Sequence, residues 1–433
     1  MDPLFAGFIG IGVLVLLLFS GMPIGFVMGL VGFLGMAYLS GSKPAFTLLS
    51  TVPYATMASY SLSVIPLFIL MGEFCFFAGI SQELYYAVHK WLGQLPGGIA
   101  MATIAACAGF AAISGSSPAT AATMGAVALP EMKRYKYDPA LATGSIAAGG
   151  TIGILIPPSV ILILYGILTE QSIGKLFLAG FIPGVLEALF YLAVIYILCK
   201  RNPQMGPRGP RTGLKEKVVS LKGTWVVLVL FFVVIGGIYL GVFSPTEAAG
   251  VGAFGAFVFA LVKRKLTGRT FADSILETGK TTAMIFIIMV GAMILGYFFA
   301  VTRLPFELAN MIAGLAVNRY IVLGIILIVY VFLGCIMDPL AMVLLTVPIF
   351  FPLVLALKFD PIWFGIIIVR VVEMGAITPP VGINVFIIKG VAKDVSMYTI
   401  FRGIFPFLVA DILHVILLIA VPQIALFLPA LME

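Results

Sequence analysis

Long apolar stretches separated by short polar ones dominate the hydropathy pattern of this chain. Many approach the ~20 residues that a helix needs to cross the hydrocarbon core of a bilayer. We therefore predict ten membrane-crossing helices, five in each half of the chain. Their predicted ranges are 4–19, 22–40, 61–80, 138–168 and 175–199, followed by 223–242, 245–262, 272–300, 361–392 and 398–425.

Two further apolar segments, 97–131 and 319–356, are each divided into two arms of about 14 to 18 residues. Such an arm rises only ~21–27 Å, which is less than the ~30 Å thickness of the bilayer core. Each segment is therefore predicted to be a re-entrant hairpin that enters and leaves on one side. The more polar stretches before them, 81–95 and 302–318, are predicted to lie along the membrane surface.

The two halves repeat the same interruptions of their apolar segments at offsets of 221 or 222 residues. Paired Gly/Pro interruptions in corresponding halves indicate helices that are broken at membrane depth, where transporters bind their ligands. The repeated motifs are ISGSSP (113–118) and GCIMDP (334–339), YDP (137–139) and FDP (359–361), and GILIPP (153–158) and GAITPP (375–380).

An odd number of crossings in each half would invert the second half relative to the first. The charges favour this topology with the N-terminus outside, because the predicted cytoplasmic segments then contain 19 of the 25 Lys and Arg residues. Arg370 is counted on neither side, because it falls within a predicted span. We expect a first repeat at 1–200, a basic cytoplasmic loop at 201–222 and a second, inverted repeat at 223–433.

Composition supports an all-α polytopic membrane protein. Hydrophobic residues make up 62% of the 433 positions, charged residues only 10%, and the mean hydropathy is +1.18. The N-terminus lacks a basic leader region, so the first apolar run is interpreted as an uncleaved helix. The four cysteines lack CxxC spacing and are interpreted as packing residues.

The sequence offers little for an enzyme or for nucleic-acid binding. It has two histidines and no HxxxH, GxSxG or GxGD motif, so metal, serine and intramembrane aspartyl chemistry are disfavoured. Asp138 is instead predicted to cap the helix that begins at Pro139. The net charge of +7 is concentrated in the central loop, which lacks the interleaved aromatic residues that stack on bases.

The repeated hairpin tips predict helix N-termini inside the membrane. Ser117 and Asp338 each precede a proline, which is the order of an N-cap followed by the first helical residue. The positive end of the second arm suits a carboxylate, and the last carbonyl groups of the first arm suit a cation. Asp338 could be an N-cap only, but the desolvation of its charge favours a role in cation or substrate binding.

The prolines at 157–158 and 379–380 are expected to free backbone carbonyl groups in the crossing helices. Freed carbonyl groups at membrane depth must line a cavity or bind an ion. Together with the hydroxyls of Ser114, Ser116, Ser117 or Thr378 they would suit Na⁺. An isolated Pro-Pro would be only a kink, and glycine pairs such as Gly25 and Gly29 usually mean close helix packing, but the constant offset favours two sites.

Several other ionisable residues lie in or near predicted spans. Arg370 and Glu373 are three residues apart on one helix, so we expect them to neutralise each other. No partner can be assigned from the sequence to four further acids, Glu73, Glu187, Glu247 and Asp411.

The chain resembles the large membrane subunit of tripartite ATP-independent periplasmic (TRAP) transporters over essentially its whole length. The motifs that carry the resemblance are the tips SGSSPATAAT (114–123) and GCIMDP (334–339) and the breaks IPPS (156–159) and ITPPVGIN (377–384). The resemblance implies a bacterial inner-membrane protein of the ion transporter superfamily, with a periplasmic N-terminus, that uses a Na⁺ gradient to import an organic acid. Hairpins and broken helices would form an elevator-type transport domain, and the other helices a scaffold domain.

The resemblance also implies site residues and partners. One Na⁺ site would comprise Ser114, Gly115, Ser116, Ser117, Gly149, Gly153 and Ile156, and the other Gly334, Met337, Asp338, Gly375, Thr378 and Pro379. The substrate would lie between the tips, near Ser116, Ser117, Pro158, Asp338, Pro380 and Asn384. The implied partners are a separate small four-helix membrane subunit, a periplasmic substrate-binding protein and membrane lipid, with Na⁺ as coupling ion and no other cofactor.

Two other functions remain open at this point. An autonomous Na⁺- or H⁺-coupled organic anion carrier of the same fold would work without a binding protein. An intramembrane enzyme would need a nucleophile and base, for which the sequence offers no pair. The acid itself is open between dicarboxylates, sialic acid and other sugar or keto acids.

Overall fold

The computed structural model describes residues 2–314 and 317–432, and every regular element in these ranges is helical. In chain order the elements are α1 (Pro3–Phe19), α2 (Ile24–Ser40), α3 (Ser42–Met57), η1 (Tyr60–Ser63), α4 (Val64–Phe77), α5 (Ile80–Leu92), α6 (Gly98–Ser114), α7 (Ser117–Arg134), α8 (Pro139–Leu155), α9 (Val160–Thr169), α10 (Ile173–Arg201), α11 (Leu214–Ser220), η2 (Leu221–Gly223), α12 (Trp225–Tyr239), α13 (Pro245–Val262), α14 (Gly268–Thr302), α15 (Leu304–Gly314), α16 (Arg319–Gly334), α17 (Pro339–Ala356), α18 (Pro361–Ile377), α19 (Ile383–Val391), α20 (Met397–Ala420) and α21 (Gln423–Ala430).

The helices agree closely with the predicted segments, with three exceptions. Helix α3 was not predicted, because its stretch is rich in Ser and Thr and contains Pro53. The segment 398–425 is two helices, since α20 ends at Ala420 and Pro422 stands just before α21. The central loop also contains the short helix α11.

Length and composition support a polytopic membrane protein. Among the described helices, seven are long and apolar enough to cross a membrane, or eight if the bent pair Leu214–Gly223 and Trp225–Tyr239 is one span. Helices α1 and α2 have 17 residues each and count among the shorter apolar helices. The ten crossings therefore stay a prediction, as does the inverted orientation of the second half.

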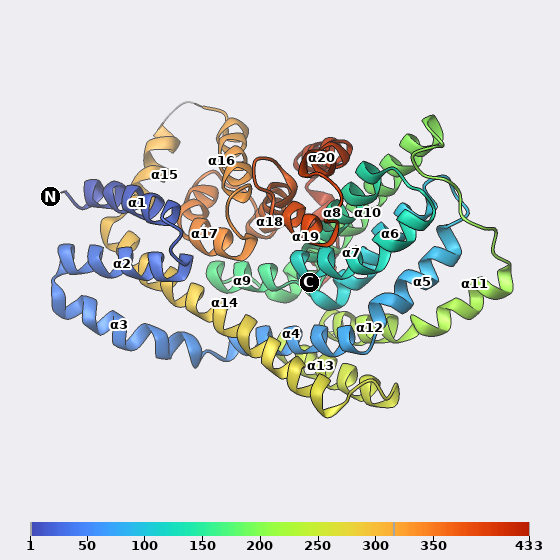
Figure 1. Cartoon of the computed structure of the whole chain (residues 1–433). Helices are drawn as coiled ribbons and strands as arrows, with labels where there is room; N and C mark the ends of the chain where they lie inside the picture. Colours follow the sequence, from blue (N-terminus) through green and yellow to red (C-terminus); the bar gives the residue numbers. More distant parts are fainter. Residues whose placement is uncertain (1, 315–316, 433) are drawn as a thin grey trace.

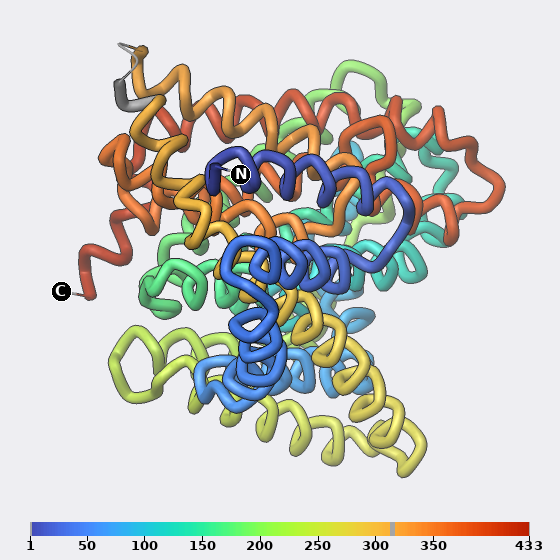
Figure 2. The backbone as a smooth tube through the Cα atoms, turned by 90° about the vertical axis from the view of Figure 1, so that its left-hand side faces the viewer, coloured from blue at the N-terminus to red at the C-terminus, as the bar shows by residue number. Residues whose placement is uncertain are grey.

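The helices form two layers joined by the 35-residue helix α14. In Figures 1 and 2, α3, α4, α12 and α13 lie below a bundle that contains α6 to α9 and α16 to α19, and α14 runs diagonally past both. Helix α14 packs along α2, α3 and α4 and also contacts α17. The turn between α6 and α7 and the turn between α16 and α17 line one cavity together with α4 and α14.

Glycines allow α2 and α14 to pack closely. A Cβ atom on Gly25 would lie 2.8 Å from the carbonyl oxygen of Ile287, and one on Gly32 would lie 2.7 Å from the amide nitrogen of Leu295. Both distances are too short for a side chain, so these positions require glycine. The expectation of close helix packing at Gly25 is confirmed, whereas Gly29 is less constrained, at 3.8 Å from Gly291.

Candidate functional site

The first hairpin consists of α6 and α7, joined by a tight tip. Gly115 has φ +57°, and a Cβ atom there would lie 2.7 Å from the carbonyl oxygen of Pro158. The N-cap of α7 is Ser116, whose hydroxyl accepts a hydrogen bond from the Ala119 amide at 3.4 Å. The prediction that Ser117 caps the helix was therefore wrong by one residue, because Ser117 already lies in the first helical turn.

Thr120 holds this tip together, although its sequence position gave no sign of that role. Its hydroxyl donates to the carbonyl oxygen of Ser116 at 2.8 Å and lies 2.9 Å from the Ser114 hydroxyl. The same hydroxyl would contact a Cβ atom on Gly153 at 3.1 Å. One threonine, fully buried, thus links the hairpin tip to the broken helix α8.

The second hairpin consists of α16 and α17, and its tip follows the prediction. The Asp338 carboxylate accepts hydrogen bonds from the amides of Leu340 (3.0 Å) and Ala341 (3.3 Å), and Pro339 is the first helical residue. Asp138 likewise caps α8 ahead of Pro139, as predicted. Met337 is buried just before the second tip.

Each tip contacts the break in the helix of its own half. Helix α8 ends at Leu155 before the first Pro-Pro, and α18 ends at Ile377 before the second. Both Pro-Pro bonds are cis. In the second half a Cβ atom on Gly375 would lie 2.6 Å from the Cα atom of Gly334, and the Gly382 amide donates to the carbonyl oxygen of Cys335 at 3.3 Å.

The residues of the two predicted Na⁺ sites are mostly brought together by these contacts. In the first set, Ile156 is the C-cap residue of α8. Gly149 faces Cys107 of α6 and therefore lies away from the tip. In the second set, the Thr378 hydroxyl donates to the Met374 carbonyl oxygen at 2.6 Å, while Pro379 beside it is exposed.

A cavity of about 690 Å³ lies between the two tips and the helices α4 and α14. Of the predicted substrate residues, Ser116 and Asp338 line it, whereas Ser117, Pro158, Pro380 and Asn384 do not. Instead, Asn384 is buried and donates through Nδ2 to the Ser117 hydroxyl at 2.8 Å. The lining residues from the tips are Ser114, Gly115, Ser116, Pro118, Ala119, Asp338, Pro339 and Leu340.

Among the described residues that line this cavity, every charged side chain is acidic. They are Glu73 on α4, Glu277 on α14 and Asp338 at the second tip, with no lysine or arginine in the lining. Glu277 forms an ion pair with Lys280 at 2.6 Å, whereas Glu73 has no hydrogen bond or ion pair to any part of the chain that the structure describes. The helix N-termini of α7 and α17 lie in the same wall.

Arg370 is the centre of a fully buried ionic network. Its guanidinium forms ion pairs with Glu187 of α10 (3.2 Å) and with Asp411 of α20. It also donates to His414 Nδ1 at 3.2 Å and to the Tyr191 hydroxyl at 3.4 Å. The network ties α10, α18 and α20 together across the bundle.

The predicted pairing of Arg370 with Glu373 was wrong. Both carboxylate oxygens of Glu373 are buried and have no hydrogen-bond partner among the described residues. The two side chains share one helix, but Glu187 and Asp411 reach the guanidinium from neighbouring helices and occupy it.

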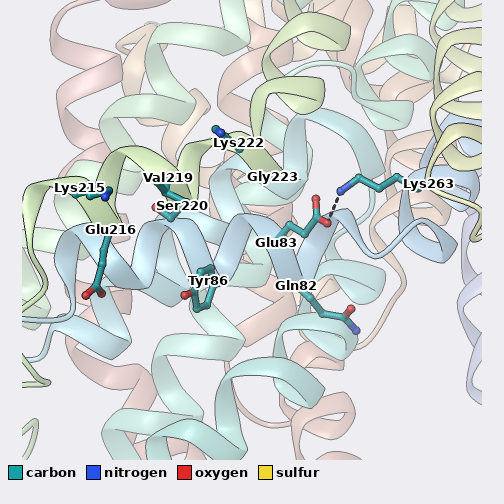
Figure 3. A pocket seen from close by; sticks show the side chains of 10 residues that line it. All are labelled: Gln82, Glu83, Tyr86, Lys215, Glu216, Val219, Ser220, Lys222, Gly223 and Lys263. Atoms are coloured by element: carbon teal, nitrogen blue, oxygen red, sulfur yellow. Dashed lines mark hydrogen bonds and ion pairs between the residues drawn. The ribbon is translucent and has the colours of Figure 1, made fainter.

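A second cavity, also of about 690 Å³, lies at the basic loop rather than at the tips (Figure 3). Helix α11 packs beside α5 here, and Lys263 forms an ion pair with Glu83 at 2.6 Å. Lys90 is paired with Glu216 at 3.1 Å, and this hydrogen bond raises the pKa of Lys90. The pair of Lys90 with Glu216 attaches α11 to α5, and this second cavity lies apart from the candidate site.

An all-helical bundle whose paired tips converge on a cavity is the architecture of a membrane transporter. Two solved structures have a similar fold. A YdaH transporter of Alcanivorax borkumensis has a TM-score of 0.64 at 13% identity, covering 87% of this chain and 88% of that one. MtrF of Neisseria gonorrhoeae has a TM-score of 0.59 at 14% identity, covering 89% and 85%. At such identities the likeness concerns the fold alone.

The chain belongs to the family of the tripartite ATP-independent periplasmic transporter, DctM component, which it matches over residues 11–424. It is 38% identical to the C4-dicarboxylate TRAP transporter large permease protein DctM of Pseudomonas aeruginosa, covering 87% of this chain and 88% of the relative. It is 33% identical to the sialic acid TRAP transporter large permease protein SiaM of Vibrio cholerae, covering 96% of each.

A third relative, the isethionate TRAP transporter permease protein DctMQ of Oleidesulfovibrio alaskensis, is 35% identical; the match covers 96% of this chain and 65% of the relative. The resemblance to TRAP large subunits is thus confirmed. These relatives are permeases and not enzymes, which agrees with the lack of enzyme motifs in the sequence.

Proposed function

We propose that this chain is the large membrane subunit of a Na⁺-coupled transporter that imports an organic acid. The observation that carries the proposal is the cavity enclosed by the two hairpin tips and the helices α4 and α14. Two helix N-termini in its wall offer their positive dipole ends to a carboxylate.

The acidic lining of the cavity supports coupling to a cation. An anionic substrate approaching Glu73, Glu277 and Asp338 would be repelled, because the lining offers no basic side chain among the described residues. Bound Na⁺ would neutralise this charge and make binding of the anion favourable. Substrate and ion would then bind together, which is the thermodynamic requirement for symport.

Two cation sites are proposed where each tip meets its broken helix. The first would use Ser114, Ser116 and carbonyl groups near Ile156, and the second would use Asp338, Thr378 and carbonyl groups near Gly334 and Gly375. The close contacts of Gly115 with Pro158 and of Gly375 with Gly334 support this pairing of tip and break. Hard oxygen ligands of this kind suit Na⁺.

An elevator movement is proposed to carry the cavity across the membrane. The hairpins and the broken helices α8, α9, α18 and α19 would form the transport domain, and α4 and α14 would belong to the scaffold domain. The position of the cavity between these two groups of helices supports such a division, since one of its walls could slide while the other stays fixed.

The remaining assignments are also proposals. The chain would lie in a bacterial inner membrane with its N-terminus in the periplasm. As a component of a tripartite family, it would act with a small four-helix membrane subunit and a periplasmic binding protein that delivers the substrate. The relatives named for C4-dicarboxylates, isethionate and sialic acid define the three acids to test first.

Reconstitution in liposomes tests the proposal. The chain, the small subunit and the binding protein would be combined, and uptake of labelled C4-dicarboxylate, isethionate and sialic acid measured with and without an inward Na⁺ gradient. We expect uptake of one acid that requires both the gradient and the binding protein. Uptake that ignores Na⁺ would reject the coupling, and uptake without the binding protein would favour an autonomous carrier.

A further inference from the structure

Glu373 is a buried acid that neither the tips nor the ionic network uses. It lies on α18, one turn before the helix breaks, and is 1% exposed. Neither carboxylate oxygen has a hydrogen-bond partner among the described residues. An ionised carboxylate without a partner is costly in an apolar interior, so the charge of Glu373 must be neutralised by a proton or by a cation that the chain itself does not supply.

A second unsatisfied acceptor lies in the same region. Asn384 of α19 is fully buried; its Nδ2 donates to the Ser117 hydroxyl, but its Oδ1 has no partner in the described part of the chain. The Ser117 hydroxyl lies near the Glu373 carboxylate, beyond the range of a well-formed hydrogen bond. Ser117 thus has the Asn384 amide group and the Glu373 carboxylate as neighbours, and the unpartnered buried oxygen atoms of α18 and α19 belong to these two side chains.

The ionic network cannot neutralise Glu373. Arg370 is already paired with two carboxylates, Glu187 and Asp411, so the network carries no spare positive charge. Helices α8 and α17 contribute no charged or titratable side chain from their own spans. Helices packed against α18 carry basic residues, among them Lys389 of α19 and Arg402 of α20, but the Glu373 carboxylate oxygens have no hydrogen-bond partner among the described residues.

We propose that Glu373, Asn384 Oδ1 and the Ser117 hydroxyl form a third cation site, occupied by Na⁺, at the junction of the two halves. A carboxylate oxygen, an amide oxygen and a hydroxyl oxygen are the hard ligands that such an ion prefers. The site joins the first hairpin to the second broken helix, unlike the two tip sites, each of which lies within one half. It rests on the proposed function and would raise the number of Na⁺ ions from two to three.

Counting bound Na⁺ tests this site without knowledge of the substrate. Equilibrium binding of ²²Na⁺ would be measured on the purified chain in detergent, for the wild type and for Glu373→Gln. The wild type is expected to bind three ions and the variant two. Glu131→Gln is the matched control, because it makes the same chemical change at the distant end of α7 and should leave three ions bound.

A folding defect would not obscure the result. Gln removes an unpaired buried charge, so Glu373→Gln is expected to melt no lower than the wild type in Na⁺-free buffer, while its gain in melting temperature on adding Na⁺ is smaller. Asn384→Ala provides a second test, since it removes Oδ1 and should also lose one ion.

The outcomes separate this site from the proposed function. Equal ion counts in the wild type and Glu373→Gln would overturn the third site while leaving Na⁺ coupling intact; protonation of Glu373 would then be the source of its neutrality. If the wild type binds no Na⁺ at all, the proposed coupling fails, and the third site fails with it.

Discussion

Replacing Arg370 with Gln should destabilise the protein more than almost any other single change. The substitution leaves Glu187 and Asp411 buried without their counter-ion, and both are fully inaccessible. Removing one partner of a buried ion pair typically costs ~3–5 kcal/mol. Because two carboxylates lose their partner here, we expect at least the upper part of that range, ~5 kcal/mol.

The assay is the free energy of unfolding in detergent micelles, from denaturant titration followed by helix content. The control is Lys133→Gln, which breaks an exposed ion pair with Asp394 and should cost less than ~1 kcal/mol. The triple variant Arg370→Gln, Glu187→Gln, Asp411→Asn should recover much of the loss, because it removes the uncompensated charges as well.

A loss of less than ~1 kcal/mol for Arg370→Gln, or no recovery in the triple variant, would refute this reasoning. The first result would mean that the carboxylates are neutral in the native state and need no counter-ion. The second would mean that Arg370 stabilises the bundle through packing rather than charge.

Three further changes address the tips. Gly115→Ala should abolish Na⁺-dependent uptake and lower the melting temperature, because the position has φ +57° and a Cβ atom would clash with Pro158; normal uptake would contradict the predicted contact. Asp338→Asn should keep the melting temperature within a few degrees, since Asn also caps helices, but should weaken Na⁺ activation at least tenfold; unchanged Na⁺ dependence would remove the proposed role of its charge. Gly375→Ala should impair uptake strongly, whereas Gly250→Ala, which meets nothing within 4 Å, should not; equal effects would argue against a tight contact between tip and break.

Features encoded by local backbone chemistry could be predicted from the sequence. The tip at Asp338 followed the Asp-Pro signal, because a capping carboxylate and a proline act on the nearest amides only. The same signal at Ser117 failed by one residue, since the preceding serine caps the helix instead, and its extended backbone places Pro118 at the second helical position. Helix α3 was not predicted, because its sequence lacks the apolar content by which a membrane span is recognised.

Contacts between distant elements could not be predicted. The partners of Arg370 lie on α10 and α20, and nothing in their spacing indicates that they reach one guanidinium. The spacing along α18 predicted Glu373 as the partner of Arg370 instead, because the sequence indicates only neighbours on the same helix. The position of Thr120 between Ser114, Ser116 and Gly153 likewise arises only when hairpin and broken helix pack together.

The two halves differ most in what their tips and breaks expose. The first tip is capped by a neutral serine, and its Pro-Pro break is buried; the second is capped by a carboxylate, and its break is exposed. An ion at the second tip would therefore meet a full negative charge and have a more accessible site, whereas an ion at the first would depend on dipoles alone. We expect the second site to bind Na⁺ more tightly and the first to fill later, so that Asp338→Asn lowers the affinity of the first ion to bind.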